Sequence, residues 1–263
     1  MKQLPYVFLL QTLLFNANAE ALFDGKWIDL THAFSNETIY WPTSKTFKKE
    51  AVFEGYTEKG YYYTAYNISM AEHGGTHIDA PVHFAEKRNT VDQIEVGQLV
   101  GPGVLIRITT KARENRNYQL SVEDILNWEK QHGPVPDKSI LLIDTGSGGY
   151  WPDKMKYMGT DMQGEPGVAS LKFPGIHPDA ARYLVTNRKI NAIGIDSPSL
   201  DFGGSKLFET HRILSEKNIP GFENVANLDQ LPTRGFWVIA LPMKIAGGSG
   251  GPLRIVAFIP GEG

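Results

Sequence analysis

The sequence predicts a single α/β domain with a mixed β-sheet and flanking helices. Strand-like and helix-like segments alternate along the chain after residue 19. The composition is that of a globular domain, with 41% hydrophobic and 21% charged residues. No low-complexity linker or internal repeat divides the chain. One domain is therefore favoured, although 263 residues could hold two.

Five short apolar runs predict buried strands. Each is bounded by residues that favour turns or loops, and each is short enough for a strand rather than a helix. The runs are Val104–Ile108, Ile140–Ile143, Ala192–Ile195, Phe236–Ala240 and Ile255–Ile259. Because helical segments lie between several of them, a sheet with helices packed beside it is expected.

Two helices are predicted from their end signals. Ser121 is suited to cap a helix that runs to His132, and Gly133-Pro134 is suited to stop it. A second helix is expected over residues 177–188, with Pro178 in its first turn, where proline lacks only a hydrogen bond that would be unmade anyway.

A third helix is predicted over residues 206–217. At helical spacing, Leu207, His211 and Leu214 share one face. His211 would then point inward among apolar residues. Taken alone, an inward histidine is more often a polar residue of the core than a ligand.

The first nineteen residues read as a secretory signal peptide. Lys2 is the only charged residue before Glu20, an apolar stretch follows it, and Ala17-Asn-Ala19 fits a cleavage site. We expect a signal peptide at 1–19, a mature domain at 20–263, and a secreted protein, periplasmic if bacterial. Cleavage would change the formal net charge from −3 to −4, because it removes one lysine and no acid.

Charge and cysteine content exclude several functions. A net charge of −3 gives no overall attraction to nucleic acid or to an anionic membrane. Without cysteine the chain can form no disulfide, thiolate metal site or cysteine nucleophile. Any nucleophile is therefore an oxygen, a nitrogen or a water molecule.

The most informative stretch is a cluster of histidines around two glycines. His73, His77, Asp79 and His83 fall within eleven residues, and imidazole with carboxylate suits Zn²⁺, Mn²⁺ or Fe²⁺. Gly74-Gly75 favours a bent loop over a helix. The segment differs from the His-Glu-x-x-His motif of zinc proteases, because a glycine occupies the glutamate position. A catalytic metal site is predicted.

Two other stretches resemble known motifs without their full context. Asp144-Thr-Gly146 resembles an aspartic protease loop, but that chemistry needs two aspartates sharing a proton, and the tripeptide occurs once. The glycine-rich segment 247–251 lacks the lysine and the following helix of a phosphate loop. Neither motif is expected to carry the function.

The cluster resembles the His-x-Gly-Thr-His-x-Asp-x-Pro-x-His signature of the cyclase family of metal-dependent hydrolases. Every signature position is filled in residues 73–83. Later blocks also match, at Gly194–Ser199, Glu223–Leu228 and Leu241–Gly251. The resemblance covers essentially the whole mature chain. It implies a mixed sheet with flanking helices in the swivelling β/β/α arrangement.

The resemblance also implies a ligand set for one or two divalent ions, Zn or Mn. His73 and His77 would bind one ion, and Asp79 would bridge two. His211 and Glu223 match the later residues that complete the second site, Glu223 as a bridge. Members of the isatin hydrolase type are thought to work with one Mn²⁺, so either number of ions is consistent with the resemblance.

Two further residues have implied roles at the substrate. His83 matches the proton donor and acceptor, and Trp41 matches a substrate-facing aromatic. Phe47 and Tyr61 are weaker candidates for stacking on an aromatic substrate. For each of these two, a place in the core or on a strand face is at least as good an explanation.

The expected function is arylformamidase-like amide hydrolysis by metal-bound hydroxide. N-formylkynurenine would give kynurenine and formate, a step of tryptophan catabolism. The alternatives are isatin hydrolase-type opening of a cyclic amide and, more remotely, a non-catalytic secreted protein that binds a metal or a small molecule. The expected partner is a small aromatic amide, with no nucleic acid and, after signal cleavage, no membrane. A homo-oligomer, dimer or tetramer, is implied by the family.

Overall fold

The structure, a computed structural model, describes residues 24–261; the expected signal segment 1–19 lies outside this range. Within it, eight strands form one sheet in the order β1-β12-β11-β5-β7-β9-β10-β4, and β12 pairs in addition with β4. This last pairing closes the sheet into a barrel, and of the strands in this sheet β1 alone lies outside the ring. The single mixed α/β domain is confirmed, whereas closure of the sheet was not predicted.

The elements of the body have the following bounds. The barrel strands are β4 (His77–Asp79), β5 (Val100–Arg107), β7 (Ile140–Asp144), β9 (Ala192–Ile195), β10 (Gly221–Glu223), β11 (Arg234–Pro242) and β12 (Gly250–Pro260), and β1 is Gly25–Asp29. The α-helices are α2 (Val96–Leu99), α3 (Thr109–Glu114), α4 (Val122–His132), α5 (Lys154–Met158), α6 (Gly164–Ala169), α7 (Pro178–Asn187) and α8 (Glu209–Ser215). Short 3₁₀ turns are η1 (Pro81–His83), η2 (Val91–Gln93), η3 (Ser147–Tyr150) and η4 (Leu228–Gln230), and β6 (Gln119–Leu120) pairs with β8 (Gly175–Ile176).

All five predicted strands are present, as β5, β7, β9, β11 and β12. Strands β5, β7, β9 and β10 run parallel. Their side chains alternate between two cores: Leu105 and Leu142 face the barrel interior, while Val104 and Leu141 pack toward the helices. Both faces are buried, and for this reason these segments read as continuous apolar runs.

The two helices predicted from end signals are also confirmed. Ser121 caps α4: its side chain accepts from the N–H of Asp124, and the Asp124 carboxylate accepts from the N–H of Ser121. Gly133 follows with a positive φ of 81°. Helix α7 begins at Pro178, and His177 caps it.

The third helix is shorter than predicted and begins at Glu209 rather than at 206. Phe208 has a left-handed backbone with φ 47°, and the Asp201 carboxylate accepts hydrogen bonds from the N–H groups of Thr210 and His211. These bonds fix the start of α8. The predicted apolar face is therefore wrong at Leu207, which is 64% exposed, but right at His211 and Leu214, which are buried.

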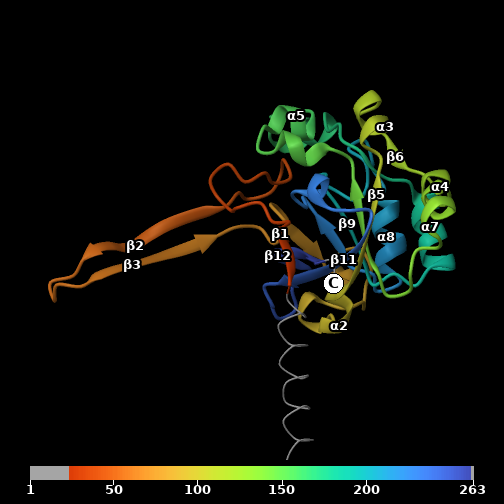
Figure 1. Cartoon of the computed structure of the whole chain (residues 1–263). Helices are drawn as coiled ribbons and strands as arrows, with labels where there is room; N and C mark the ends of the chain where they lie inside the picture. The colour runs from red at the N-terminus through yellow and green to blue at the C-terminus, as the bar shows by residue number, and fades with distance from the viewer. Residues whose placement is uncertain (1–23, 262–263) are drawn as a thin grey trace, which may run out of the picture.

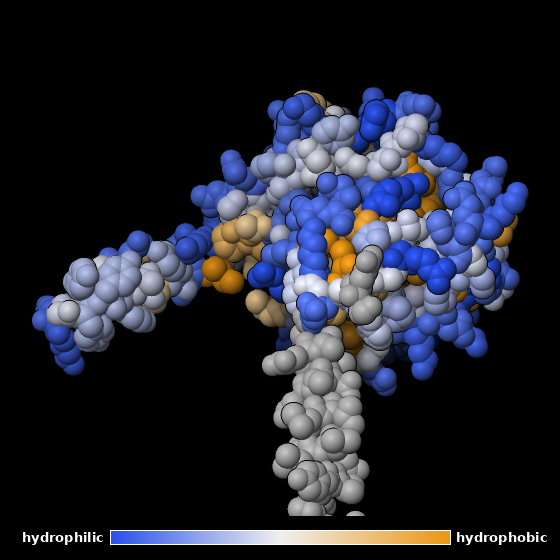
Figure 2. All heavy atoms as spheres, viewed as in Figure 1, coloured by the Kyte–Doolittle hydropathy of each residue, from blue (hydrophilic) through white to orange (hydrophobic). Residues whose placement is uncertain are grey.

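A two-stranded arm projects from the body (Figure 1). It consists of β2 (Lys48–Tyr56) and β3 (Tyr62–Ser69), paired antiparallel, and no other described strand pairs with either. The rings of Phe53 and Tyr63 stack across the two strands. In the space-filling view the outer part of the arm stands clear of the body (Figure 2).

Among the described residues no helix combines the length and the apolar character needed to cross a membrane.

Candidate metal centre

The motif residues occupy a loop, a short strand and a 3₁₀ turn in succession. His73 lies in the loop before β4, His77 and Asp79 are on β4, and His83 ends η1. In the barrel register His77 lies opposite Glu223 of β10. Closure of the sheet through β4 thus brings the motif to the carboxyl end of the parallel strands, where ligand sites of α/β sheets usually lie.

The two motif glycines are required by the backbone. Gly74 has φ 151° and Gly75 has φ 58°, backbone conformations that residues other than glycine rarely adopt. A Cβ atom on Gly74 would overlap the Tyr40 ring. The bent loop expected between His73 and His77 is confirmed.

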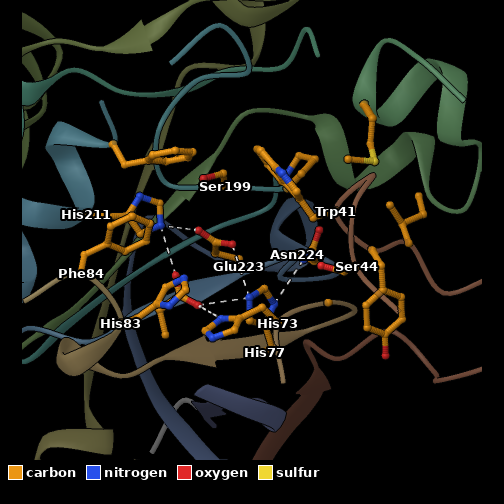
Figure 3. Close-up of a pocket in the computed structure, with 17 residues that line it drawn as sticks. Trp41, Ser44, His73, His77, His83, Phe84, Ser199, His211, Glu223 and Asn224 are labelled. Atoms are coloured by element: carbon orange, nitrogen blue, oxygen red, sulfur yellow. Dashed lines mark hydrogen bonds and ion pairs between the residues drawn. The ribbon is translucent and has the colours of Figure 1, made fainter. Parts of the chain in front are cut away.

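Three histidines converge on two carboxylates (Figure 3). His73 Nδ1 lies 2.7 Å from Asp79 Oδ1, and His77 Nε2 lies 3.2 Å from the same oxygen. His77 Nε2 is also 3.4 Å from Glu223 Oε2. His211 Nε2 lies 3.1 Å from Asp79 Oδ2 and 2.9 Å from Glu223 Oε1. The five residues implied as ligands therefore form one cluster.

The other ring nitrogen of each of these histidines is held by the protein. His77 Nδ1 is 3.0 Å from the Gly75 carbonyl, and His211 Nδ1 is 2.6 Å from Asp201 Oδ2. His73 Nε2 is 2.9 Å from Ser249 Oγ. A carbonyl or carboxylate can only accept, so His77 and His211 each carry a proton on Nδ1, and Nε2, on the side of Asp79 and Glu223, is the nitrogen that could bind an ion. Such outer contacts are the usual way in which proteins orient metal-binding histidines.

The burial of these groups makes the arrangement unfavourable unless a cation lies between them. Asp79, Glu223, His77 and His211 each expose 6% of the side chain or less. His77 Nε2 is buried and has no hydrogen-bond partner. Two sets of ligand atoms lie within 4.8 Å of one another: one from His77, Asp79 and Glu223, the other from His73, Asp79 and His83. The donor set therefore fits a divalent metal.

Charge interactions within the cluster oppose the effect of burial. Burial alone would raise the pKa of Asp79, but the three surrounding histidines hold it well below its usual range. Burial would lower the pKa of His211, but Asp201, Asp79 and Glu223 raise it well above its usual value. The carboxylates thus favour a positive charge at this position, whether carried by a proton or by a metal ion.

His83 differs from the other three histidines. Its ring stacks on that of His73, with the centroids 3.8 Å apart, and it borders the same cavity. Within the described residues no protein group forms a hydrogen bond with its ring nitrogens, so its proton is not fixed. Although His83 reaches solvent, the packing of protein around it lowers its pKa to about 4. His83 is thus neutral at neutral pH.

A cavity of about 260 Å³ opens above the cluster. Its walls carry several apolar or aromatic side chains, among them Ile39, Trp41, Phe84, Met158 and Phe208. Trp41, the predicted substrate-facing aromatic, is thus one of the residues that line this cavity. No lysine or arginine of the described chain lines the cavity.

The weaker aromatic candidates lie elsewhere. Phe47 is buried against Phe34, outside the cavity, and Tyr61 is at the turn of the arm. Phe47 thus takes the alternative that the sequence allowed, a place in the core, whereas Tyr61 lies in the turn just before β3. Asp144, the protease-like aspartate, pairs with Arg107 and does not line the cavity.

Sequence reasoning missed several residues that shape the site. Asp201 holds His211, and Asn224 donates from Nδ2 to the Gly75 carbonyl beside His77. Phe84 and Phe208 form part of the cavity wall. Phe84 directly follows His83, a position that could have suggested it. Asp201 precedes His211 by ten residues, a spacing that carries no signal.

Comparison with known proteins gives consistent matches. A family model described as a putative cyclase matches residues 28–202. An isatin hydrolase of Roseibium aggregatum is 29% identical over 213 residues, which cover 78% of each protein. A kynurenine formamidase of Bacillus cereus is 28% identical over 238 residues, or 88% of this chain and 97% of the relative.

Two solved structures have the same fold over nearly their whole length. Isatin hydrolase A from Labrenzia aggregata, bound to benzyl benzoate, has a TM-score of 0.81 and 31% identity, covering 96% of this chain and 99% of that one. An isatin hydrolase bound to the product analogue thioisatinate has a TM-score of 0.84 and 26% identity, covering 95% and 99%.

Proposed function

The chain belongs to the cyclase family, and on this basis we propose that it is a metal-dependent hydrolase of small, neutral aromatic amides. One observation carries the proposal. Three histidines, each tethered at its outer nitrogen, converge on two buried carboxylates, while a fourth, untethered histidine borders the same aromatic cavity. Tethered histidines suit metal binding, and an untethered one suits proton transfer.

His73, His77, Asp79, His211 and Glu223 would hold one or two divalent ions, Zn or Mn. The orphaned, buried Nε2 of His77 supports this assignment, because a nitrogen in that position otherwise has no partner. A bound ion would act as a Lewis acid on the amide carbonyl and on water. Asp201 and Gly75 would keep the ligand nitrogens of His211 and His77 turned inward.

His83 would move the proton. Its pKa of about 4 leaves a ring nitrogen free at neutral pH to accept a proton from the attacking water. The Asp79 carboxylate favours the charged ring that results. His83 would then donate that proton to the leaving nitrogen, so that the amine departs neutral.

The cavity favours a neutral ring over an amino acid. Trp41, Phe84 and Phe208 offer aromatic surface, and no cationic side chain of the described residues is present to pair with a carboxylate. A cyclic amide such as isatin, opened to a carboxylate and an aryl amine, is therefore the first candidate. N-formylkynurenine, the substrate of tryptophan catabolism first expected from the sequence, is the second, since its charged tail would have to remain in solvent.

The test is hydrolysis of isatin and of N-formylkynurenine by protein that has been stripped with a chelator and reloaded with Zn²⁺ or Mn²⁺. We expect turnover only after reloading and faster turnover of isatin. Faster release of kynurenine would reverse the order of substrates but keep the reaction class. Tight metal binding with no turnover of either amide would favour a non-catalytic binding protein and contradict the proposal.

We further propose that the protein is exported and cleaved after Ala19, on the basis of residues 1–19 alone. Expression of the full chain with recovery of the secreted or periplasmic fraction should give a mature protein that begins at Glu20. Intact mass measurement would detect it, and retention of the uncut chain inside the cell would contradict export.

A further inference from the structure

We propose that Glu72 and Ser249 are positioning residues that fix the orientation and the proton of His73. Ser249 Oγ donates a 2.7 Å hydrogen bond to Glu72 Oε2, and the Ser249 backbone N–H donates to the same oxygen at 3.1 Å. The hydroxyl has a single hydrogen, and it points toward Glu72 in this hydrogen bond. Toward His73 Nε2, 2.9 Å away, the hydroxyl oxygen can therefore only accept.

The direction of these bonds sets the tautomer of His73. Nε2 carries a proton, which it donates to Ser249, so Nδ1, which lies 2.7 Å from Asp79 Oδ1, is the nitrogen left to bind an ion. With an ion bound, His73 would turn the lone pair of Nδ1 toward that ion, as His77 and His211 would turn the lone pair of Nε2. The Ser249 hydroxyl, held by Glu72, accepts the hydrogen bond from the outer nitrogen of His73. The Gly75 carbonyl does the same for His77, and the Asp201 carboxylate does the same for His211.

The position of His73 explains why it needs this support. His77 is fixed within β4 and His211 within α8, but His73 lies in the preceding loop, and its side chain is 23% exposed against 3% and 4% for the other two. An imidazole in such a loop can rotate about χ2 and exchange its two nitrogens. A tether from a separate segment removes that freedom.

The glycine-rich segment 247–251 brings its backbone close to His73 and Glu72. A Cβ atom on Gly250 would overlap the His73 ring, and one on Gly248 would come within 3.1 Å of Glu72 Oε1. Glycines let the backbone approach both residues closely and place Ser249 between them. The segment that resembled a phosphate loop thus supports a ligand histidine.

Ser249, His73 and Asp79 also follow the order of a serine hydrolase triad, and this alternative can be weighed on geometry. A nucleophilic serine must face the substrate and give its proton to the histidine. Ser249 does not line the cavity, and its hydroxyl donates its hydrogen bond to Glu72 rather than to His73. The structure therefore assigns Ser249 a supporting contact rather than attack on the substrate.

This inference rests on the proposed metal site, and its test measures metal binding directly. Zn²⁺ and Mn²⁺ affinities are determined by competition with a chromophoric chelator for the wild type and for Ser249→Ala, Glu72→Ala and Glu72→Gln. The control is Ser170→Ala, which removes an exposed serine hydroxyl bonded to the Pro166 carbonyl. Nitrogen-15 NMR of histidine-labelled protein gives the tautomer of His73, and kcat and KM are measured at saturating metal.

We expect Ser249→Ala and Glu72→Ala to weaken metal binding by about 10- to 100-fold, the usual loss for an outer partner of a ligand. Glu72→Gln retains an acceptor for the Ser249 hydroxyl and should stay close to the wild type. In Glu72→Ala the hydroxyl is free to donate to Nε2, so NMR should show the proton moving to Nδ1. Excess metal should restore kcat, with little change in KM.

The outcomes separate the inference from the function on which it rests. A wild type that binds neither metal would overturn the proposed function itself. A wild type that binds metal, with unchanged affinity and tautomer in Ser249→Ala and Glu72→Ala, would overturn the positioning role alone. Loss of activity in Ser249→Ala that saturating metal does not restore, at wild-type metal affinity, would instead identify a nucleophile. If Ser249→Ala does not fold, the comparison of Glu72→Ala with Glu72→Gln still tests the positioning role.

Discussion

At the scale of single residues, four histidines of similar chemistry are distinguished by what holds their outer nitrogen. His73, His77 and His211 are each held by an acceptor, so each turns one fixed nitrogen inward. His83 has no such contact among the described residues, and it can take up and release a proton without breaking one. This difference distinguishes the proposed ligands from the proposed acid–base group more clearly than burial does.

Replacing His83 with Ala should lower kcat and leave metal content unchanged. General acid–base catalysis contributes about 10²- to 10⁴-fold, so a loss in that range is expected. Metal analysis of the purified variant, together with kcat on the better substrate, provides the check. The matched control is His177→Asn, which keeps a capping side chain on an exposed helix end. Full activity of His83→Ala, or loss of its metal, would remove the assigned role.

His32, which does not line the cavity, gives a prediction for pH-dependent stability. Its ring stacks on Trp151, its Nε2 is buried without a partner, and burial lowers its pKa from 6.5 to about 4. Between these values the unfolded chain binds the proton and the folded chain does not. His32 therefore imposes no penalty above pH 6.5 and destabilises the fold progressively as the pH falls toward 4.

The variant His32→Phe, which keeps the stacked ring, should lose less stability than the wild type between pH 6.5 and 4. One proton corresponds to at most about 1.4 kcal/mol per pH unit. Urea unfolding of chelator-treated protein across this range measures the difference and excludes effects of metal loss. Parallel pH profiles for the variant and the wild type would show that His32 does not titrate in this way.

At the scale of elements, the site depends on one short strand and the loop that leads into it. Strand β4 has three residues, yet it pairs with both β10 and β12 and thereby closes the barrel. The preceding loop must turn sharply to bring His73 beside Asp79. Its glycines are therefore the positions at which a small substitution should act on the site.

Gly74→Ala is expected to disrupt this loop, because the new Cβ would overlap the Tyr40 ring and a φ of 151° is strained for alanine. Such a change should destabilise the fold by about 1 to 3 kcal/mol and weaken metal binding. Gly97→Ala is the matched control: it lies in α2, and its Cβ would meet no atom within 4 Å. Thermal unfolding and metal titration of both variants measure these two effects. Equal stability and equal metal affinity of the two variants would contradict the role of the loop.

At the scale of the whole molecule, the arm formed by β2 and β3 has no strand partner in the body among the described residues. A two-stranded hairpin is marginally stable in water by itself. This one exposes a large apolar or aromatic surface along both strands, including Val52 (61%), Tyr56 (76%) and Ile68 (53%). Its outer backbone edges are also unpaired among the described strands. Such a surface suits contact with another protein chain.

We expect a second copy of this chain to cover the arm, in keeping with the homo-oligomer that the family resemblance implies. Replacing residues 50–67 with a short turn should convert the assembly to a monomer. The control, Leu126→Gln, removes an exposed apolar side chain from α4 of the body and leaves the arm intact. Light scattering after gel filtration gives the mass of each. A full-length protein that is itself monomeric, or an unchanged assembly without the arm, would contradict the expectation.

The local sequence predicted five of the strands and the starts of two helices, and the family resemblance supplied the candidate ligands. Apolar runs marked the buried strands, and Ser121 and Pro178 marked helix starts, because the signals for these features lie within a few residues. The signature in residues 73–83 indicated the candidate metal site for the same reason. The start of α8 was misplaced because it depends on Asp201, eight residues before Glu209, which is the first residue of the helix.

Only the tertiary structure decided how the parts combine. Closure of the barrel through β4, the tether from Asp201 to His211 and the contact of Ser249 with His73 join residues that are 10 to 176 positions apart. No periodicity or cap encodes such contacts, since their free energy arises only when separate segments pack together. The cavity and its lack of cationic residues likewise exist only in the assembled fold. The sequence by itself thus determined which groups are available for chemistry, and packing decided which nitrogen of each histidine faces the site.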